Sequence, residues 1–509
     1  MKKELIIIGV ILLLGLSLYS LTLRGEFGNP GPGDFKNNLD QAARPFELSP
    51  ERGRYVHIVN LAERGKYDLS QEWAEVAYPD VGISNGKYYS YFAPGTSYFA
   101  LPFYLLGAKF NLAQVAVFFA EILVSIISLV FIYKIAKNVF SLTARASLFS
   151  VLVFAFASTA WSYSVTLYQH AFTVLFMTTA FYAAWKFAKE SGWRAWLYAS
   201  WVWVAYALSI TVDYPNVILM LPIMVYFAYS TFSVKKLEEG FSLTIKWAAV
   251  ATFLVFALIT GLHFWHNAHY YGSWHQLAGG LQSYRHPDEI ANNASASAGT
   301  TKNVATFFSE RAIPHGFYIL LFSDERGLFF FYPIFALSLF GIWAYSKKSR
   351  EGGVSAEYIL AVALILTNLT LYSSWGDPWG GWAYGPRYLI PSMAFLSIFV
   401  GVFISSGAYT GLKKFLAFLL FLYSSAVALL GALTTNAVPT RGEAMLLPIK
   451  KYNFLKNIDF IYSDQSGSFI YKTYLSGKLS LVAYYLIIYI AIALVVALVL
   501  IASRDKKHG

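Results

Sequence analysis

The chain has 509 residues, of which 57% are hydrophobic and 13% are charged, and its mean hydropathy is +0.49. This composition excludes an ordinary soluble globular protein and predicts a polytopic membrane protein. A formal charge of +11 would favour nucleic acid as the partner of a soluble chain. Here Lys and Arg instead occur in short clusters between apolar segments, a pattern that sets membrane orientation, so no nucleic-acid partner is expected. The absence of cysteine excludes disulfides, thiolate metal sites and cysteine nucleophiles.

About twelve apolar segments are long enough to cross a bilayer, so we expect an all-α membrane protein whose extracytoplasmic loops carry short interfacial helices. The first segment follows Lys2 and Lys3 and has no signal-peptide cleavage site, so we expect it to remain as a helix. When twelve spans are threaded, every clear basic cluster falls on one side, which predicts a multi-pass protein of the cytoplasmic membrane with both termini in the cytoplasm. The expected spans are about 5–23, 112–133, 146–161, 170–185, 195–212, 216–232, 247–263, 327–345, 356–374, 388–405, 415–435 and 479–503.

The connections between these spans are too small to form a soluble domain, so residues 1–509 are predicted to form a single membrane domain. Three extracytoplasmic connections are long, at residues 24–111, 264–326 and 436–478. The apolar stretch 97–107 is too short to cross the bilayer and is expected to lie in the membrane interface. Chemistry in water is expected at these connections.

Two carboxylates of the first long connection are candidates for a general base. Ser49 and Pro50 predict the start of a helix with Ser49 as its cap, and Glu51 would lie in the first turn, where the helix dipole favours its ionised form. An ionised carboxylate there can accept a proton from a hydroxyl or an amine. The alternative is that Glu51 only stabilises the helix. Asp80, beside the aromatic run GKYYSYFAPG, is the rival base, although loop carboxylates are usually only solvated.

A tryptophan-rich segment, WGDPWGGWAYGPRYLIP at 375–391, precedes the tenth expected span. Its single arginine, Arg387, could bind a phosphate at the level of the lipid headgroups, with aromatic residues flanking a sugar or a prenyl chain. The alternative is an interfacial aromatic belt with an arginine that reaches out to lipid headgroups. His170, at the start of the fourth span, could donate to the same phosphate or could merely lie at the interface.

Histidines at positions 263, 266, 269 and 275 suggest a metal site, but no carboxylate is placed to complete the ligand set. A divalent cation is therefore possible but not indicated, and no other cofactor is expected. Glu121 is the main ionisable residue inside a span. One such charge gives little support to a transporter, whose spans usually carry several.

Three patches of the sequence resemble the GT-C superfamily of integral-membrane glycosyltransferases, in the branch of protein O-mannosyltransferases and lipid A aminoarabinose transferases. The patches are ERGRYVHIVNLAERG at 51–65, GKYYSYFAPGTSYFALPFYLLG at 86–107 and WGGWAYGPRYLIP at 379–391. The likeness in the order of loops and spans covers nearly the whole chain. Glu51 stands where this branch usually has Asp, three residues before Arg54.

The resemblance implies a glycosyltransferase that moves a sugar from a polyprenyl-phosphate carrier to a lipid, glycan or protein acceptor at the outer face of the cytoplasmic membrane. The alternatives are a lipid or sugar transporter or flippase, and a polysaccharide polymerase or ligase with a diphosphate-linked donor. Under the implied function Glu51 or Asp80 would be catalytic. The expected substrate-binding residues are Arg54, Tyr55, Lys87, Tyr88, Tyr89, His170, Trp382, Tyr384 and Arg387.

Overall fold

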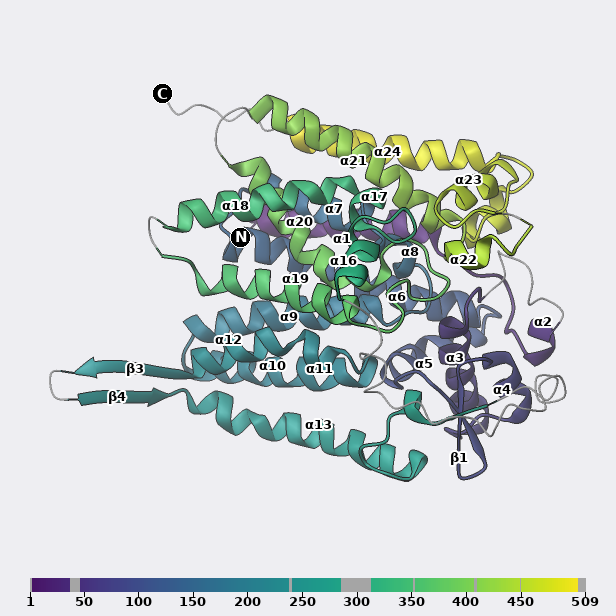
Figure 1. Ribbon diagram of the computed structural model, residues 1–509, viewed down its shortest axis with the longest axis horizontal. Coiled ribbons are helices and arrows are strands. Elements are labelled where there is room, and N and C mark those ends of the chain that lie inside the picture. Colours follow the sequence, from purple (N-terminus) through teal and green to yellow (C-terminus); the bar gives the residue numbers. More distant parts are fainter. Residues whose placement is uncertain are drawn as a thin grey trace.

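The computed structural model describes residues 2–36, 46–237, 240–284, 313–350, 353–406, 410–448 and 450–501. Residues 285–312 of the second long connection lie outside the described residues. Figure 1 shows long, roughly parallel helices, with short helices and strands gathered at one end of the bundle. The start of α1 and the end of α24 both lie at the opposite end.

Nine helices in the described part of the chain are long and apolar enough to cross a membrane, which confirms the predicted helical membrane fold. Each of the nine corresponds to one of the expected spans. They are α1 (Lys2–Thr22), α6 (Ala113–Lys134), α9 (His170–Lys189), α10 (Gly192–Val212), α13 (Trp247–Tyr271), α19 (Ala356–Ser373), α20 (Ile390–Ser405), α21 (Thr410–Leu433) and α24 (Leu481–Ile501).

Shorter helices stand at the three other expected spans. Proline explains two of the shortenings: Pro222 is at the start of α12, and Pro333 lies in the 3₁₀ turn η4 just before α18. The short helices are α7 (Ala144–Phe156), α11 (Asn216–Leu219) followed by α12 (Leu221–Thr231), and α18 (Ala336–Arg350).

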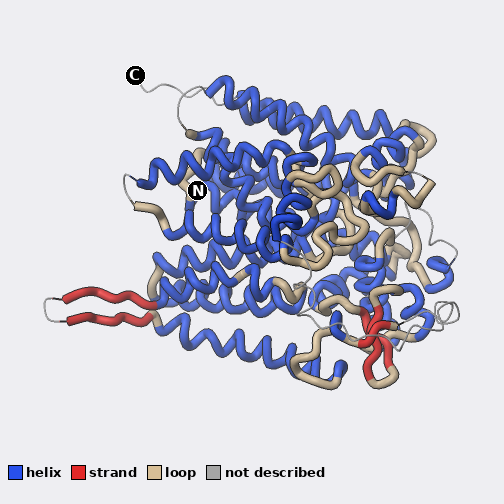
Figure 2. The backbone as a smooth tube through the Cα atoms, viewed as in Figure 1, coloured by secondary structure: helices blue, strands red, loops and turns tan. Residues whose placement is uncertain are grey.

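The small amount of β-structure was not expected from the sequence. A three-stranded sheet has the order β2-β1-β5, and a separate hairpin of β3 and β4 extends beyond the helices at the other end (Figure 2). Asn85 and Gly86 between β1 and β2 have φ of 49° and 72°, as a type I′ turn requires. The pairing of β1 with β5 brings the segment after α13 against the first connection. The strands are β1 (Val81–Ser84), β2 (Lys87–Ser90), β3 (Phe232–Leu237), β4 (Gly240–Ile245) and β5 (Gln282–Ser283).

The first connection folds into a set of short elements around one buried helix, α3. Tyr55 on α3 is fully buried, with its ring centroid 4.4 Å from that of Phe46 and 5.9 Å from that of Tyr104. The expected cap is not formed: Leu48 precedes the helix, and the Ser49 hydroxyl donates to Asp80 instead. The elements are α2 (Pro32–Lys36), α3 (Ser49–Val59), the π-helical turn η1 (Asn60–Arg64), α4 (Gln71–Ala77) and α5 (Gly95–Ala108).

The apolar stretch expected at the interface lies within α5, where Tyr98, Leu105 and Leu106 are exposed while Ala100 and Tyr104 are buried. One apolar face thus points away from the protein, as an interfacial helix requires. The remaining short elements are η2 (Ile135–Val139), α8 (Ala160–Ser164), η3 (Ala278–Gly280), α16 (Ile313–Leu321), α17 (Leu328–Phe331), η4 (Pro333–Phe335), η5 (Arg387–Leu389), α22 (Arg441–Ala444), α23 (Leu455–Tyr462) and η6 (Tyr471–Leu475).

Arg24 fastens the end of α1 to a distant part of the chain. Its guanidinium is buried, forms an ion pair with Glu47 at 3.0 Å and donates to the carbonyl oxygen of Gly431 at the end of α21. The amide of Phe469 donates to the carbonyl of Leu23 at 2.7 Å. A buried charge requires such pairing, so the contacts fix the start of the first connection.

Candidate active site

A cavity of about 370 Å³ lies where the first connection meets the ends of several helices. Aromatic and apolar side chains form most of its wall, and four charged or amide side chains interrupt it, a composition typical of ligand sites. We call this space the cavity. Its lining comprises Pro50 and Arg54 of α3, residues 91–93, Tyr168 and Gln169 before α9, residues 213–215 and 217–218 around the start of α11, residues 277 and 279–280, residues 371, 372 and 375, and residues 387–388.

Two arginines of the cavity flank one tyrosine ring. The guanidinium carbon lies 5.9 Å from the centroid of the Tyr168 ring for Arg54 and 5.7 Å for Arg387. Arg54 also lies over Phe92 at 4.5 Å, and Arg387 over Tyr388 at 5.4 Å. Aromatic faces stabilise a guanidinium without using its N–H donors. The two cations are therefore able to bind a phosphate or another anion.

Asp213 is the carboxylate of the cavity. It follows the last residue of α10, and burial raises its pKa to about 6, although Arg54, a hydrogen bond from Gln169 and Arg387 act in the opposite direction. Gln169 Nε2 donates to Asp213 Oδ2 at 3.4 Å, and Gln169 Oε1 accepts from Arg54 Nη2 at 2.6 Å. A carboxylate with a pKa just below neutrality suits general-base chemistry.

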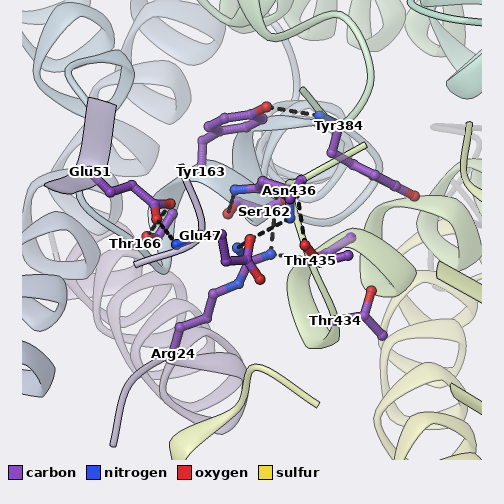
Figure 3. Close-up of polar contacts among 12 residues, drawn as sticks. Arg24, Glu47, Glu51, Ser162, Tyr163, Thr166, Tyr384, Thr434, Thr435 and Asn436 are labelled. Atoms are coloured by element: carbon purple, nitrogen blue, oxygen red, sulfur yellow. Dashed lines mark hydrogen bonds and ion pairs between the residues drawn. The ribbon is translucent and has the colours of Figure 1, made fainter. Parts of the chain in front are cut away.

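Glu51, one of the two expected bases, is buried beside the cavity and does not line it. Its carboxylate accepts from Thr166 Oγ1 at 2.7 Å and from the Glu47 amide at 2.9 Å (Figure 3). Burial, and next the charge of Glu47, raise the pKa of Glu51 to about 7, while Arg24 lowers it. The bond to Thr166 connects α3 to the segment that carries Tyr168 and Gln169, so Glu51 supports the wall of the cavity.

Asp80, the other expected base, is half-buried and accepts from Ser49 Oγ at 2.5 Å. It does not line the cavity. Its backbone carbonyl accepts from the Tyr91 amide at 3.0 Å. Asp80 thus connects the start of α3 to the residues that form one edge of the cavity.

Of the nine expected substrate-binding residues, Arg54 and Arg387 line the cavity, and the other seven do not. Tyr55 packs in the core around α3, as described above. Lys87 lies on the surface, 3.5 Å from Asp68, and the ring of Tyr88 is 5.2 Å from that of Tyr284. Tyr89 belongs to a buried tyrosine cluster. These side chains stabilise the sheet and its surroundings.

The three other expected binding residues lie behind or outside the cavity wall. His170 is buried, with its ring stacked on Tyr168 at 6.0 Å. The backbone amide of Tyr384 donates to the Tyr163 hydroxyl at 3.0 Å, and the Tyr384 ring is buried in the core. Trp382 donates to the Glu443 carboxylate. Among the described residues, no three His, Asp or Glu side chains converge in a way that would hold a metal ion.

Comparisons with known proteins agree with the sequence resemblance. Residues 93–265 match the family described as dolichyl-phosphate-mannose-protein mannosyltransferase. The archaeal oligosaccharyltransferase AglB from Archaeoglobus fulgidus, in complex with an inhibitory peptide and a dolichol-phosphate, has the same fold, with a TM-score of 0.52 and 11% identity over 86% of this chain and 57% of that chain. The family match and the shared fold agree with the resemblance of the sequence to GT-C glycosyltransferases.

Two further structures are similar to this chain. The Archaeoglobus fulgidus oligosaccharyltransferase tethered to an acceptor peptide containing the NVT sequon gives a TM-score of 0.50 and 12% identity over 87% of this chain and 56% of that chain. ArnT from Cupriavidus metallidurans in the apo state gives 0.44 and 14% over 96% of this chain and 76% of that chain. The chain therefore spans little more than half the length of the oligosaccharyltransferases. A comparison with curated protein sequences finds no match.

An apolar groove of the helix bundle adjoins the cavity. Ile218 and Leu371 line both the cavity and a hollow beside the last turns of α19. Thr367 joins this hollow to another, which continues between α12 and α19 as far as Ala356. The groove runs along α19, whose length is roughly 27 Å at 1.5 Å per residue. This length is close to the thickness of the hydrocarbon core of a bilayer.

Sequence reasoning missed Gln169, Tyr168 and Asp213 as site residues. Asp213 carried a signal, because it is a carboxylate at the end of an apolar span and is followed by Tyr214 and Pro215. Gln169 carried none, since its importance depends on contacts with α3 and with the end of α10, both distant in sequence.

Proposed function

We propose that this protein is a GT-C enzyme that transfers a sugar from a polyprenyl-phosphate carrier to an acceptor at the outer face of the cytoplasmic membrane. The observation that carries the proposal is the cavity itself, where two arginines and one carboxylate meet at the end of an apolar groove. A prenyl chain would occupy the groove, and its phosphate would lie between Arg54 and Arg387. The matched family is named for a dolichyl-phosphate sugar donor, and one similar structure contains a dolichol-phosphate.

In the proposed reaction Asp213 accepts the proton of the acceptor hydroxyl or amine as the acceptor atom attacks the anomeric carbon. The bond between that carbon and the phosphate oxygen breaks, and the electron pair leaves with the lipid phosphate. The phosphodiester thereby becomes a phosphomonoester with additional negative charge. Arg54 and Arg387 would stabilise the charge that develops, and such stabilisation lowers the barrier because it is stronger in the transition state.

The expected bases Glu51 and Asp80 remain competing proposals for the same step. Asp213 is favoured because it lines the cavity together with both arginines, whereas the other two carboxylates do not. The proposed orientation in the membrane rests on the basic clusters between the expected spans, which all fall on one side. In this orientation the end of the bundle that carries the cavity faces outward, and both termini face the cytoplasm.

The test uses purified protein in lipid nanodiscs with radiolabelled dolichyl-phosphate-mannose and a membrane extract as the acceptor. We expect the label to leave the lipid, with dolichyl phosphate as the second product. Asp213→Asn should abolish the release, whereas Glu51→Gln and Asp80→Asn should retain most of it. If the label stays on the lipid with this and other polyprenyl-phosphate sugars, while the protein moves them across liposome membranes, the chain is a flippase and the proposal is wrong.

A second arm of the test separates mono- from diphosphate donors. A polymerase or ligase would cleave polyprenyl-diphosphate sugars in preference, and the proposed enzyme would not. Blocking the groove with Thr367→Trp should raise the KM for a long-chain donor more than for a short-chain analogue, because only the long chain reaches that residue. Leu258→Trp, which places the same bulk on the exposed face of α13, is the matched control and should leave both KM values unchanged.

A further inference from the structure

Two opposite charges line the cavity without forming an ion pair. Arg54 and Asp213 both border it, and Arg54 is 2% exposed, yet Gln169 stands between them. The amide oxygen of Gln169 accepts from Arg54 at 2.6 Å, and its amide nitrogen donates to Asp213 at 3.4 Å. Arginine has only donors and an ionised carboxylate only acceptors, so this orientation of the amide is the one that satisfies both partners.

Opposite charges that are buried together attract strongly, because little water screens them. Without an intervening group, the carboxylate would approach the guanidinium directly. The Asp213 oxygens would then compete with the lipid phosphate for the donors of Arg54, and the carboxylate would become a weaker base. The site therefore needs a spacer that has both a donor and an acceptor at its end.

The contacts of Gln169 hold it in this position. Its backbone carbonyl accepts from the Thr173 amide at 3.0 Å at the start of α9. Three residues earlier, Thr166 donates to Glu51 on α3. Arg54 is held on its other side, where Nη1 donates to the Pro50 carbonyl at 3.0 Å. The spacing between the two charges is thus set by groups that are themselves fixed.

We propose that Gln169 is a positioning residue that separates Arg54 from Asp213, so that the guanidinium stays available to the phosphate and the carboxylate stays available to the acceptor. This inference rests on the proposed function, because it assigns the two charges to phosphate and acceptor. It differs from a general structural role in one respect: it predicts that two substitutions of Gln169 shift the ionisation of Asp213 in opposite directions.

Gln169→Met has a similar length but neither donor nor acceptor. Losing the weak 3.4 Å hydrogen bond alone would raise the pKa of Asp213 slightly, but a direct ion pair with Arg54 lowers a carboxylate pKa by about 1 to 3 units, so the net shift is downward. The acid limb of the kcat/KM profile should move to lower pH by about one unit. The affinity for dolichyl phosphate should fall roughly tenfold, because Arg54 is engaged.

Gln169→Glu keeps the acceptor for Arg54 but places a second carboxylate beside Asp213. Like charges that share a site raise the pKa of one of them, so the acid limb should move to higher pH. Gln114 supplies the matched control: it is also a buried glutamine, but it lies at the start of α6, outside the cavity lining, where its side chain accepts from the Glu26 amide at 3.2 Å. Gln114→Met and Gln114→Glu should leave the acid limb where it is in the wild type.

The experiment measures the pH profile of kcat/KM with dolichyl-phosphate-mannose and, separately, the affinity for dolichyl phosphate alone between pH 4 and pH 8. An ionised Asp213 repels the phosphate, so the affinity for dolichyl phosphate should change as Asp213 ionises. An inflection in the plot of affinity against pH that is present in the wild type and absent in Asp213→Asn therefore reports the ionisation of this carboxylate without any turnover. Opposite shifts of that inflection in the two Gln169 variants support the inference. Parallel losses of activity with an unshifted inflection overturn it while the proposed function stands. Absence of transfer by the wild type overturns the proposed function, and the binding curves still decide the role of Gln169.

Discussion

Replacing Asp213 with asparagine tests the central claim about the cavity. A positioned general base contributes typically about 10² to 10⁴ in rate, or about 3 to 5 kcal/mol of transition-state stabilisation. Asp213→Asn keeps the size of the side chain and its acceptor for the Gln169 amide but removes the basicity. We expect kcat/KM for dolichyl-phosphate-mannose to fall by at least about a hundredfold.

The wild-type pH profile carries an independent part of this prediction. With a pKa of about 6, Asp213 is about nine-tenths ionised at pH 7 and about one-tenth ionised at pH 5. Because the ionised form is the active base, kcat/KM should decline about tenfold per pH unit at the acid end, with its midpoint near pH 6. A base at Glu51, whose pKa is raised by burial and by Glu47, would instead place the midpoint at higher pH.

Initial rates of sugar release at subsaturating donor give kcat/KM, and dolichyl phosphate binding shows whether the variant still folds around the site. Removing a negative charge from the cavity should leave that binding as tight as in the wild type, or tighter. The reasoning is refuted if Asp213→Asn retains more than about a tenth of the wild-type kcat/KM while Glu51→Gln abolishes it.

Three other perturbations address the anion site, the packing of the bundle and the buried carboxylate. Arg387→Gln should weaken dolichyl phosphate binding about 10- to 100-fold, the loss expected when a charged hydrogen bond of about 1.5 to 3 kcal/mol is removed, and equal affinity would exclude Arg387 from the anion site. Gly341→Ala should lower the apparent Tm by several degrees, because the added Cβ would stand 1.9 Å from a backbone oxygen of α20. The control is Gly261→Ala on α13, where the added Cβ meets nothing within 4 Å. The pKa of Glu51 is raised to about 7 in the folded protein. The stability that Glu51 contributes is therefore fully present below its unfolded pKa and is lost as pH rises through about 7. The difference in Tm between wild type and Glu51→Gln should change between these two pKa values, and a constant difference would contradict the raised pKa of Glu51.

The helical membrane fold was predictable because long apolar runs and basic clusters are local signals. The expected spans fail to reach full length where proline interrupts them, as at Pro222 before the main part of α12. The hairpin of β1 and β2 also had a local signal in Asn85 and Gly86, but an expectation of helices throughout the chain concealed it. The third strand, β5, had none, since it exists only through pairing with a segment about 200 residues earlier.

Of the candidate site, the sequence predicted only the two arginines that line the cavity. Arg54 and Arg387 stood out because both lie in patches that resemble a known superfamily, and Arg387 is the single arginine of its tryptophan-rich segment. The choice of carboxylate depended on which way each side chain points, and a sequence does not show this. Glu51 lies one helical turn from Arg54 in the chain, yet its carboxylate faces Thr166 and the Glu47 amide, while Asp213 comes from another helix to reach the cavity.

The attachment of Arg24 has a consequence for how the protein is made. Its partner Gly431 follows 407 residues later, and the amide that pairs with the carbonyl of Leu23 comes from Phe469. At a synthesis rate of about 5 to 20 residues per second, the ribosome needs some 20 to 80 seconds to supply these partners. During that interval Glu47 is the available partner of the guanidinium, and the end of the first helix lacks its contacts with the last helices. This end of the molecule is therefore completed only after Phe469 has been synthesised, and truncation before residue 431 leaves Arg24 without its contact to Gly431.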